Sequence, residues 1–275
     1  MDNNIHLSIP TINNFQATYY FADDPEQYPP RVWPLHLHSE LEIYILLEGD
    51  VSFVVETSIY HLSPGTAIII KPNEMHNCIL HSKSVHKHLC FWFNPSCKFL
   101  FDSFLSHDFG NDNLIIPDER SKTRLSEIYR QLKEATDNSN KQEQFSLTLQ
   151  MLAIFRNFIS NHSPIQKIPQ LLSDILCDID KNFKTIHSLS YLTEKFYISQ
   201  STLNRLFRVH LHTTPKMYVE TKRLAHSRIL LSEGRSVLDS CIEAGFPDRS
   251  NFIRLFKKRF SITPKQYQEN PGSSN

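Results

Sequence analysis

The chain has 275 residues and a mass of 32.1 kDa, a length that predicts two domains at about 150 residues per domain. Hydrophobic residues make up 40% and charged residues 21%, values typical of globular protein, and 29 basic residues balance 29 acidic ones. The six glycines are scattered, which excludes a Gly-rich phosphate loop, and no apolar run approaches the ~18 residues of a membrane span. The start is polar and the five cysteines form no C-x-x-C pair, so we expect a cytoplasmic protein with reduced thiols.

Short strands of alternating pattern fill residues 18–93. The clearest are residues 41–46, 51–55 and 67–70, and turn-forming residues at 48–50 and 63–65 separate them. Strands this short and this evenly spaced predict a small barrel or jelly roll.

A polar cluster interrupts this barrel. His36, His38 and Glu42 have even spacing, so an extended strand would point all three to one side, and His76 begins a later strand. Three imidazoles and a carboxylate suit Zn, Mn, Fe or Ni. Three interpretations stay open: the lining of an effector pocket, a metal site, or partly buried histidines of structural role. Trp33 and Tyr44 either stack on the ligand or belong to the core.

Two amphipathic helices follow, over residues 118–136 and 143–162, with a polar turn at 137–140. Their apolar stripes would pack on the barrel or across a dimer. Residues 162–167 then have the composition of an interdomain linker.

The two halves carry opposite charge. Before Ile168 there are 13 Lys and Arg against 19 Asp and Glu, and from Ile168 onward the counts are 16 and 10. A basic half next to an acidic one suggests that the basic half meets a polyanion.

The basic half contains an internal repeat. Residues 205–218 and 254–267 align without a gap, and seven of the 14 positions are identical. One structural unit is therefore used twice.

Each unit has the pattern of a helix–turn–helix. In the first, Ser199 is suited to cap a helix from about residue 200 to 209. In the second, Gly245 permits a left-handed turn and Asp248 is the cap. The first helix of that second unit would bury Val237, Leu238, Cys241 and Ile242. A continuous helical pattern from Lys216 to Leu231 joins the units.

The second helix of each unit leaves a face of polar and basic residues exposed. Arg pairs bidentately with guanine and Asn with adenine, while Ser and Lys hold phosphates, so this face predicts DNA binding. The residues are Ser201, Asn204, Arg205, Arg208, Arg249, Ser250, Asn251, Arg254 and Lys257.

Positions 170–270 resemble the DNA-binding domain of AraC/XylS-type transcriptional regulators. The resemblance is carried by Gly245-Phe246-x-Asp248-x-Ser250-x-Phe252-x-Arg254-x-Phe256-Lys257-Lys258, Thr263-Pro264-x-x-Tyr267, Arg223-Leu224 and Leu230-Leu231. It implies two units that enter successive major grooves of promoter DNA. His212 and Ser261 stand where the family usually has a glycine, so we expect strained or reshaped turns there. Ser240 replaces a usual aliphatic residue, which predicts a weakened second core.

The N-terminal half resembles the cupin pattern His-x-His-x3-Glu-x6-Gly, here ending at Gly49, followed by Gly65, Pro72 and His76. The stretch from Pro72 to His76 is one residue shorter than in metal-binding cupins. In AraC-type regulators this barrel usually senses a small molecule, often a sugar, and commonly without metal. The effector pocket that this implies comprises Trp33, His36, His38, Glu42, Tyr44 and His76.

The sequence therefore predicts an α+β protein with an N-terminal cupin-like β-barrel and a helical pair, then an all-α domain. We place an effector-sensing and dimerisation domain at residues 1–163, a linker at 164–169 and a DNA-binding domain at 170–270, with helix–turn–helix units at about 188–209 and 236–259. The predicted function is ligand-responsive activation of nearby genes, without enzymatic activity or cofactor. The expected partners are promoter DNA, a small molecule such as a sugar, RNA polymerase and a second copy of the chain. The alternative is a metal-dependent cupin enzyme using His36, His38, Glu42 and His76.

Overall fold

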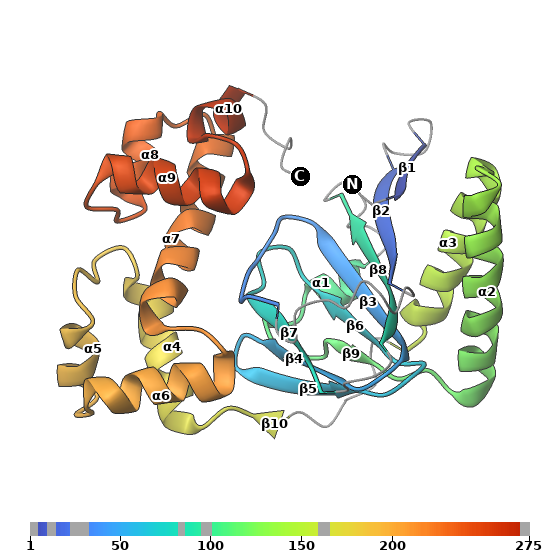
Figure 1. The fold of residues 1–275 in the computed structure, drawn as a ribbon, viewed down its shortest axis with the longest axis horizontal. Helices are drawn as coiled ribbons and strands as arrows, with labels where there is room; N and C mark the ends of the chain where they lie inside the picture. The colour runs from blue at the N-terminus through green and yellow to red at the C-terminus, as the bar shows by residue number, and fades with distance from the viewer. Residues whose placement is uncertain are drawn as a thin grey trace. The chain divides into compact units, whose positions relative to one another are not determined.

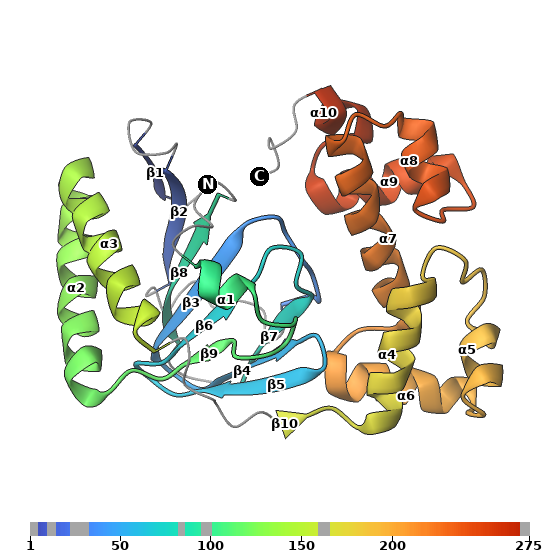
Figure 2. The ribbon, with the colours of Figure 1, turned by 180° about the vertical axis from the view of Figure 1, so that it is seen from behind.

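The computed structural model describes residues 5–9, 15–22, 33–81, 86–94, 101–158 and 166–269. It divides into two compact units, Met1–Lys167 and Ile168–Asn275. Figure 1 shows a β-rich N-terminal unit and an all-helical C-terminal unit, and Figure 2 shows both from behind. The α+β class expected from the sequence is confirmed. Residues 164–165 of the expected linker lie outside the described residues.

The N-terminal unit contains two antiparallel sheets. The larger has the strand order β1-β2-β8-β3-β6-β9 and the smaller β10-β5-β4-β7. The strands are β1 (Ile5–Ile9), β2 (Phe15–Ala22), β3 (Leu41–Glu48), β4 (Val51–Val55), β5 (Ser58–Leu62), β6 (Ala67–Ile70), β7 (His76–Leu80), β8 (Lys87–Phe93), β9 (Leu114–Ile115) and β10 (Gln166–Lys167).

Strand β3 is buried on both faces, which explains its run of apolar residues. Leu41, Ile43 and Ile45 belong to a core shared with the helices, because odd positions of the strand point that way. Tyr44 and Leu46 point to the other face and pack with residues of the four-stranded sheet. The space between the two sheets is therefore reached by the even-numbered side chains of β3.

A helical pair covers the outer face of the large sheet (Figure 2). After the short α1 (Asp102–Leu105), α2 (Glu119–Asp137) and α3 (Lys141–Arg156) run against each other. Their buried side chains, Leu125, Ile128, Leu132 and Phe155 among them, share one core with the sheet. The sequence placed the end of the second helix at residue 162; α3 ends at Arg156, and residues 159–162 lie outside the described residues.

The C-terminal unit consists of helices. They are α4 (Gln170–Asn182), α5 (Ser190–Lys195), α6 (Gln200–Leu211), α7 (Pro215–Ser232), α8 (Val237–Glu243), α9 (Arg249–Phe260) and α10 (Pro264–Glu269). The pairs α5–α6 and α8–α9 are the two helix–turn–helix units, and α7 joins them, as Figure 1 shows. Across the described residues, no helix has both the length and the apolar character that a membrane crossing needs.

The caps expected from the sequence are confirmed. The Ser199 side chain accepts a hydrogen bond from the Thr202 amide at 3.1 Å, and the Asp248 carboxylate accepts one from the Asn251 amide at 2.6 Å. Each bond satisfies an amide that has no partner within its own helix. Gly245 has φ +84°, the left-handed turn that its position predicted.

Two residues of the expected stripe on α8 are not buried. Leu238 is 48% and Ile242 63% exposed, whereas Cys241 and Ser240 are buried. At about 100° of rotation per residue, the buried Ser240, Cys241 and Ala244 share one face, and Leu238 and Ile242 lie more than about 100° from the centre of that face. The prediction that these two residues are core was wrong.

The second helix of each unit, α6 or α9, ends in a strained turn, and these two are called the reading helices below. His212 has φ 49° and Ser261 φ 61°, the left-handed conformation that glycine adopts without cost. Both turns thus have the backbone geometry usual for glycine, although His212 and Ser261 have a Cβ that makes this conformation sterically unfavourable. Ser240 is fully buried, and its hydroxyl has no hydrogen-bond partner among the described residues. The left-handed φ angles confirm the strained turns, and the buried hydroxyl of Ser240 is the reason that we expect a weakened second core.

Candidate functional site

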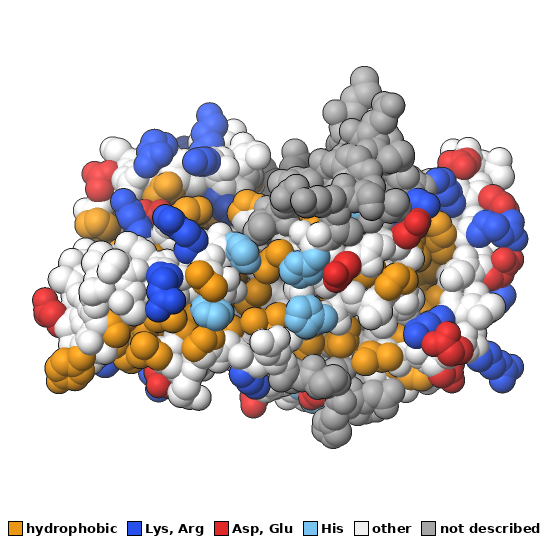
Figure 3. Space-filling model, turned by 60° about the horizontal axis from the view of Figure 1, so that its bottom comes forward, with side chains coloured by type: hydrophobic (Ala, Val, Ile, Leu, Met, Phe, Trp, Pro, Cys, Tyr) orange, Lys and Arg blue, Asp and Glu red, His pale blue; other side chains and the backbone are white. Residues whose placement is uncertain are grey.

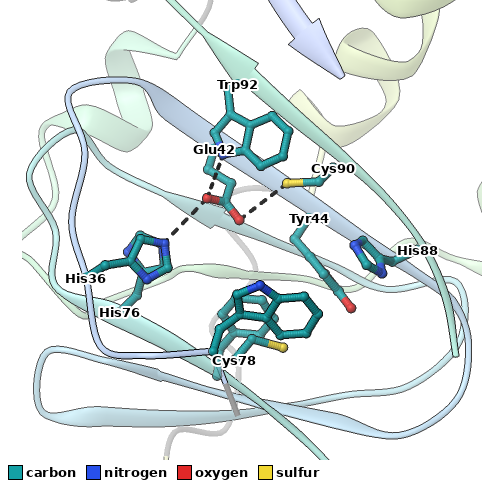
Figure 4. A pocket seen from close by; sticks show the side chains of 10 residues that line it. His36, Glu42, Tyr44, His76, Cys78, His88, Cys90 and Trp92 are labelled. Atoms are coloured by element: carbon teal, nitrogen blue, oxygen red, sulfur yellow. Dashed lines mark hydrogen bonds and ion pairs between the residues drawn. The ribbon is translucent and has the colours of Figure 1, made fainter. Parts of the chain in front are cut away.

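A cavity of about 270 Å³ lies between the two sheets of the N-terminal unit. Figure 4 shows the side chains that reach it. They are Trp33, His36, Glu42, Tyr44, Phe53, His76, Cys78, His88, Cys90 and Trp92. Of the six residues proposed from the sequence, all but His38 line the cavity, and His38 contacts Glu42.

Strand pairing explains why these side chains meet. Strand β8 pairs with β3 so that Trp92 lies opposite Glu42 and Cys90 opposite Tyr44. Neighbouring positions of paired strands point to the same face, so the even-numbered residues of both strands enter the cavity. Strand β7 contributes His76 and Cys78 by the same alternation.

One end of the cavity carries the polar cluster. The candidate ligand atoms of His36, His38, Glu42 and His76 all lie within 4.8 Å of one another. A two-way backbone bridge joins His36 and His76, with N–O distances of 2.9 and 2.8 Å. Although the stretch from Pro72 to His76 is short, His76 therefore reaches the cluster. It is buried, with 1% of its surface exposed.

The three imidazoles have the same orientation. In each ring Nδ1 lies at hydrogen-bond distance from a backbone carbonyl oxygen, which can only accept. Nδ1 therefore carries a proton in each ring, and Nε2 faces the cluster. His38 also has an acceptor at Nε2, the Glu42 carboxylate, which outweighs burial and raises the pKa of His38. The pairs are His36 with Pro34 at 2.9 Å, His38 with Glu40 at 3.0 Å and His76 with Glu74 at 2.8 Å.

Glu42 is the centre of the cluster. Its Oε2 lies 2.8 Å from His38 Nε2 and accepts a hydrogen bond from Trp92 Nε1 at 3.0 Å, and its Oε1 accepts one from the Cys90 thiol at 3.4 Å. Burial opposes ionisation of this carboxyl, but the imidazoles of His38 and His76 outweigh it and hold the pKa of Glu42 well below its usual range. Glu42 is thus an anion inside the sheet sandwich.

The other end of the cavity carries a second, uncharged polar group. His86 Nε2 lies 2.9 Å from the Tyr44 hydroxyl and 2.8 Å from His88 Nδ1. The Tyr44 ring stacks on His88 with a centroid distance of 4.4 Å. Burial, together with His86, lowers the pKa of His88 to about 3, so His88 is neutral at ordinary pH. Figure 4 shows His88 at the end opposite His36 and His76.

The cavity walls between the two ends are aromatic and sulfur-containing. Trp33, Phe53 and Trp92 supply apolar surface, and burial raises the pKa of the thiols of Cys78 and Cys90. Both cysteines are therefore protonated packing residues. Sequence reasoning missed Phe53, Cys78, His88, Cys90 and Trp92 as cavity residues. The signal for three of them was present, since 88, 90 and 92 alternate along one strand.

The helices α6 and α9 present the predicted DNA-facing residues. Of these nine, Asn251 alone is half-buried and the other eight are exposed. The Asn251 side-chain oxygen accepts a hydrogen bond from the Arg254 guanidinium at 2.7 Å, which orients that guanidinium. In Figure 3, Lys and Arg side chains gather on the visible face of this unit with few acidic ones among them, whereas both signs mix around α2.

These features define a DNA-binding regulator with a ligand-binding domain. The AraC-like ligand binding domain model matches residues 19–155, and the helix-turn-helix domain model matches residues 192–270. The chain belongs to the AraC/XylS family of transcriptional regulators, as the sequence predicted.

Relatives with regulatory descriptions cover nearly the whole chain. The probable transcriptional regulator LumQ of Photobacterium leiognathi is 26% identical over 234 residues, 85% of this chain and 91% of LumQ. The transcriptional activator RhaS of Enterobacter sp. (strain 638) is 23% identical over 262 residues, 90% of this chain and 91% of RhaS. Among solved structures, ToxT of Vibrio cholerae O395 has a TM-score of 0.40 at 13% identity, covering 94% of this chain and 98% of ToxT.

Proposed function

We propose that a small molecule bound in the cavity of the N-terminal unit controls the activation of nearby genes by this DNA-binding regulator. The protein then acts in the cytoplasm as a homodimer that contacts promoter DNA and RNA polymerase. The observation that carries the DNA-binding part is the placement of Arg205 and Arg254. They occupy equivalent positions of α6 and α9, both are exposed, and each follows a capped helix start. Arg at such a position reads guanine in the major groove.

Fluorescence anisotropy with DNA from the upstream region of its own gene tests this assignment. We expect Arg205→Ala and Arg254→Ala each to weaken specific binding by about 5- to 150-fold, the equivalent of about 1–3 kcal/mol. The matched control is Arg235→Ala, which removes an exposed arginine outside both reading helices. Equal weakening on specific and random DNA would make the two arginines phosphate contacts.

The effector part rests on the two-ended cavity. An anionic carboxylate at one end, a neutral His–Tyr pair at the other and aromatic walls between them favour a small ring-shaped molecule with several polar groups. A monosaccharide has these properties, because its C–H faces stack on aromatic rings and its hydroxyls make hydrogen bonds.

Tryptophan fluorescence gives a direct test, because the only two tryptophans of the chain, Trp33 and Trp92, both line the cavity. We expect a monosaccharide panel to contain a compound that changes this fluorescence and the reporter output together. Replacing His38 or Glu42 with Gln is expected to remove the response while DNA binding stays. No response to the whole panel would exclude a sugar effector.

We also infer that the cavity binds its ligand without transforming it, since the same chain carries the DNA-binding unit that would report occupancy. The alternative, a metal-dependent cupin enzyme, is favoured by the cluster of His36, His38, Glu42 and His76. Mass spectrometry of the effector recovered after incubation with the protein separates the two. Recovery of unchanged effector supports a sensor, and a product formed over many turnovers would establish an enzyme.

A further inference from the structure

The polar cluster of the cavity has the dimensions of a metal site. Zn–N and Zn–O bonds are about 2.0–2.2 Å long, so ligands of one ion lie within about 4.4 Å of one another. The four candidate atoms of His36, His38, Glu42 and His76 already lie within 4.8 Å. Placing the most distant pair around one ion requires a closure of about 0.4 Å if the two ligands lie on opposite sides of the ion, and of about 1.4 Å in a tetrahedral site.

The orientation of the rings is the second argument. Nδ1 of each imidazole donates to a backbone carbonyl, so Nε2 is the nitrogen directed at the cluster. His38 Nε2 donates to Glu42 in the ion-free protein and would release that proton when an ion binds. Metal-bound histidines show this arrangement, in which a fixed acceptor on the far nitrogen sets the tautomer and the ring orientation. Three Nε2 atoms and a carboxylate thus converge from separate parts of the chain, residues 36–42 and β7.

The buried nitrogen of His76 is the third argument. Its Nε2 is enclosed and forms no hydrogen bond within the described residues; Glu42 Oε2 is 3.5 Å away. A buried polar atom without a partner costs about 1–3 kcal/mol, and it persists where binding requires it. An ion between His76 and Glu42 would satisfy both groups.

We propose that His36, His38, Glu42 and His76 bind one divalent transition-metal ion of the zinc, nickel or iron class, with its remaining coordination position open to the effector cavity. Three imidazoles favour these ions over Mg²⁺ and Ca²⁺, which prefer all-oxygen sites. Of the four ligands, His36, Glu42 and His76 line the cavity, and His38 contacts Glu42. Only the role of the cavity as the effector site rests on the proposed function. The ion then selects effectors that carry an oxygen donor such as a vicinal diol or hydroxy acid.

The experiment uses the full chain without a histidine tag, stripped with a chelator and desalted. We expect isothermal titration with Zn²⁺ to give one ion per chain and Co²⁺ to give visible d–d absorption. Because Trp92 donates to Glu42, binding should also change the tryptophan fluorescence. Millimolar Mg²⁺ should compete with neither ion.

The variants Glu42→Gln and His36→Gln each remove one ligand with little change in volume. Each is expected to weaken Zn²⁺ binding by at least about 100-fold, more than the loss of a supporting group outside the site. The matched control is the double variant His61→Gln/His81→Gln. That pair has a ring separation of 6.2 Å and shares Ser52 as a hydrogen-bond partner, so it is the alternative imidazole site in the same unit.

Retained affinity in the double variant, with loss in both single variants, supports the proposal. Substoichiometric binding to the unmodified chain, or loss in the double variant alone, overturns it. Urea unfolding of the stripped single variants, followed by tryptophan fluorescence, shows that their N-terminal unit is folded, because Trp33 and Trp92 both belong to it. If the unmodified chain binds no ion but still responds to its effector, the metal site is refuted and the sensor function is kept. If it binds the ion but no effector changes DNA binding, the sensor function is refuted and the metal site is kept.

Discussion

Gly245 lies against the backbone of Lys184, so closely that a Cβ on Gly245 would be 2.1 Å from the Lys184 carbonyl oxygen. Lys184 precedes the first helix–turn–helix unit and Gly245 is the turn of the second. Arg223 of α7 supports the same junction, donating to the carbonyls of Phe183 and Ile186 at 2.8 and 2.6 Å. The segment before the first helix–turn–helix unit is therefore held against the second by a close backbone approach, and Arg223 of α7 ties the same segment to the linking helix.

Replacing Gly245 with Ala is expected to disrupt this junction. The left-handed φ alone costs a side chain about 1–2 kcal/mol, and the contact with Lys184 adds to it. Gly234 is the matched control, because it has the same φ of +84° with no atom within 4 Å of a new Cβ. In urea unfolding followed by circular dichroism, we expect Gly245→Ala to lose at least about 2 kcal/mol more than Gly234→Ala. Equal losses of stability in the two variants would mean that the backbone at Lys184 moves to accommodate the new Cβ.

The spacing of the two reading helices leads to a second prediction. Units joined by α7 and fixed at Gly245 should contact two major-groove segments one helical turn, ~10–10.5 bp, apart on one face of the DNA. Footprinting should show two protected segments at this distance. An insertion of ~5 bp between them turns one segment to the opposite face and should abolish specific binding. Unchanged affinity for that DNA would contradict the fixed geometry.

Ser240 leads to a third prediction. Its buried hydroxyl has no hydrogen-bond partner among the described residues, so Ser240→Ala should raise the free energy of unfolding by about 1 kcal/mol. Ser227 is equally buried, but its hydroxyl donates to the Leu224 carbonyl at 2.8 Å. Ser227→Ala should therefore be neutral or destabilising by about 1 kcal/mol in the same urea titration. If both substitutions have the same effect, the hydroxyl of Ser240 is satisfied by water.

The strained turn at Ser261 leads to a fourth prediction. Glycine adopts φ 61° without the steric cost that serine has, so Ser261→Gly should stabilise the C-terminal unit by about 0.5–1 kcal/mol. Glu233 ends α7 with φ −79°, where glycine offers no such relief. Glu233→Gly should therefore lower the thermal midpoint while Ser261→Gly raises it. A lower midpoint for both would show that the Ser261 side chain contributes contacts that outweigh the strain.

Local patterns in the sequence predicted the features that local physics determines. Ser199 and Asp248 are recognisable as caps because a cap needs only an oxygen before a helix. The even spacing of His36, His38 and Glu42 selected residues that meet, but only Glu42 lies on a strand, β3, and His38 does not line the cavity. The rest of the cavity depends on which strands pair. Trp92 reaches Glu42 only because β8 pairs with β3 in that register, across 50 residues of sequence. The prediction that Leu238 and Ile242 are buried was wrong because a helix of only two turns has too few apolar residues to show which face is buried.

Low pH should destabilise the N-terminal unit because of His88. In the folded state burial, with His86 beside it, lowers the pKa of His88 to about 3, whereas the ordinary value is 6.5. Below pH 6.5 the unfolded chain binds a proton that the folded chain does not, so stability falls as the pH falls toward 3. One such proton contributes a slope of about 1.4 kcal/mol per pH unit. Tyr44, His86 and Glu42 are the other titratable groups around this ring.

Urea unfolding followed by tryptophan fluorescence isolates this effect, because Trp33 and Trp92 both belong to the N-terminal unit. From roughly pH 6 down to roughly pH 4, His88→Gln should flatten the dependence of the unfolding free energy on pH by about 1 kcal/mol per unit. His81→Gln removes an exposed imidazole from the same unit and serves as the control. Parallel pH curves for the unmodified chain and His88→Gln would mean that the folded unit opens to protonate His88, and that the Tyr44 end of the cavity is accessible to water.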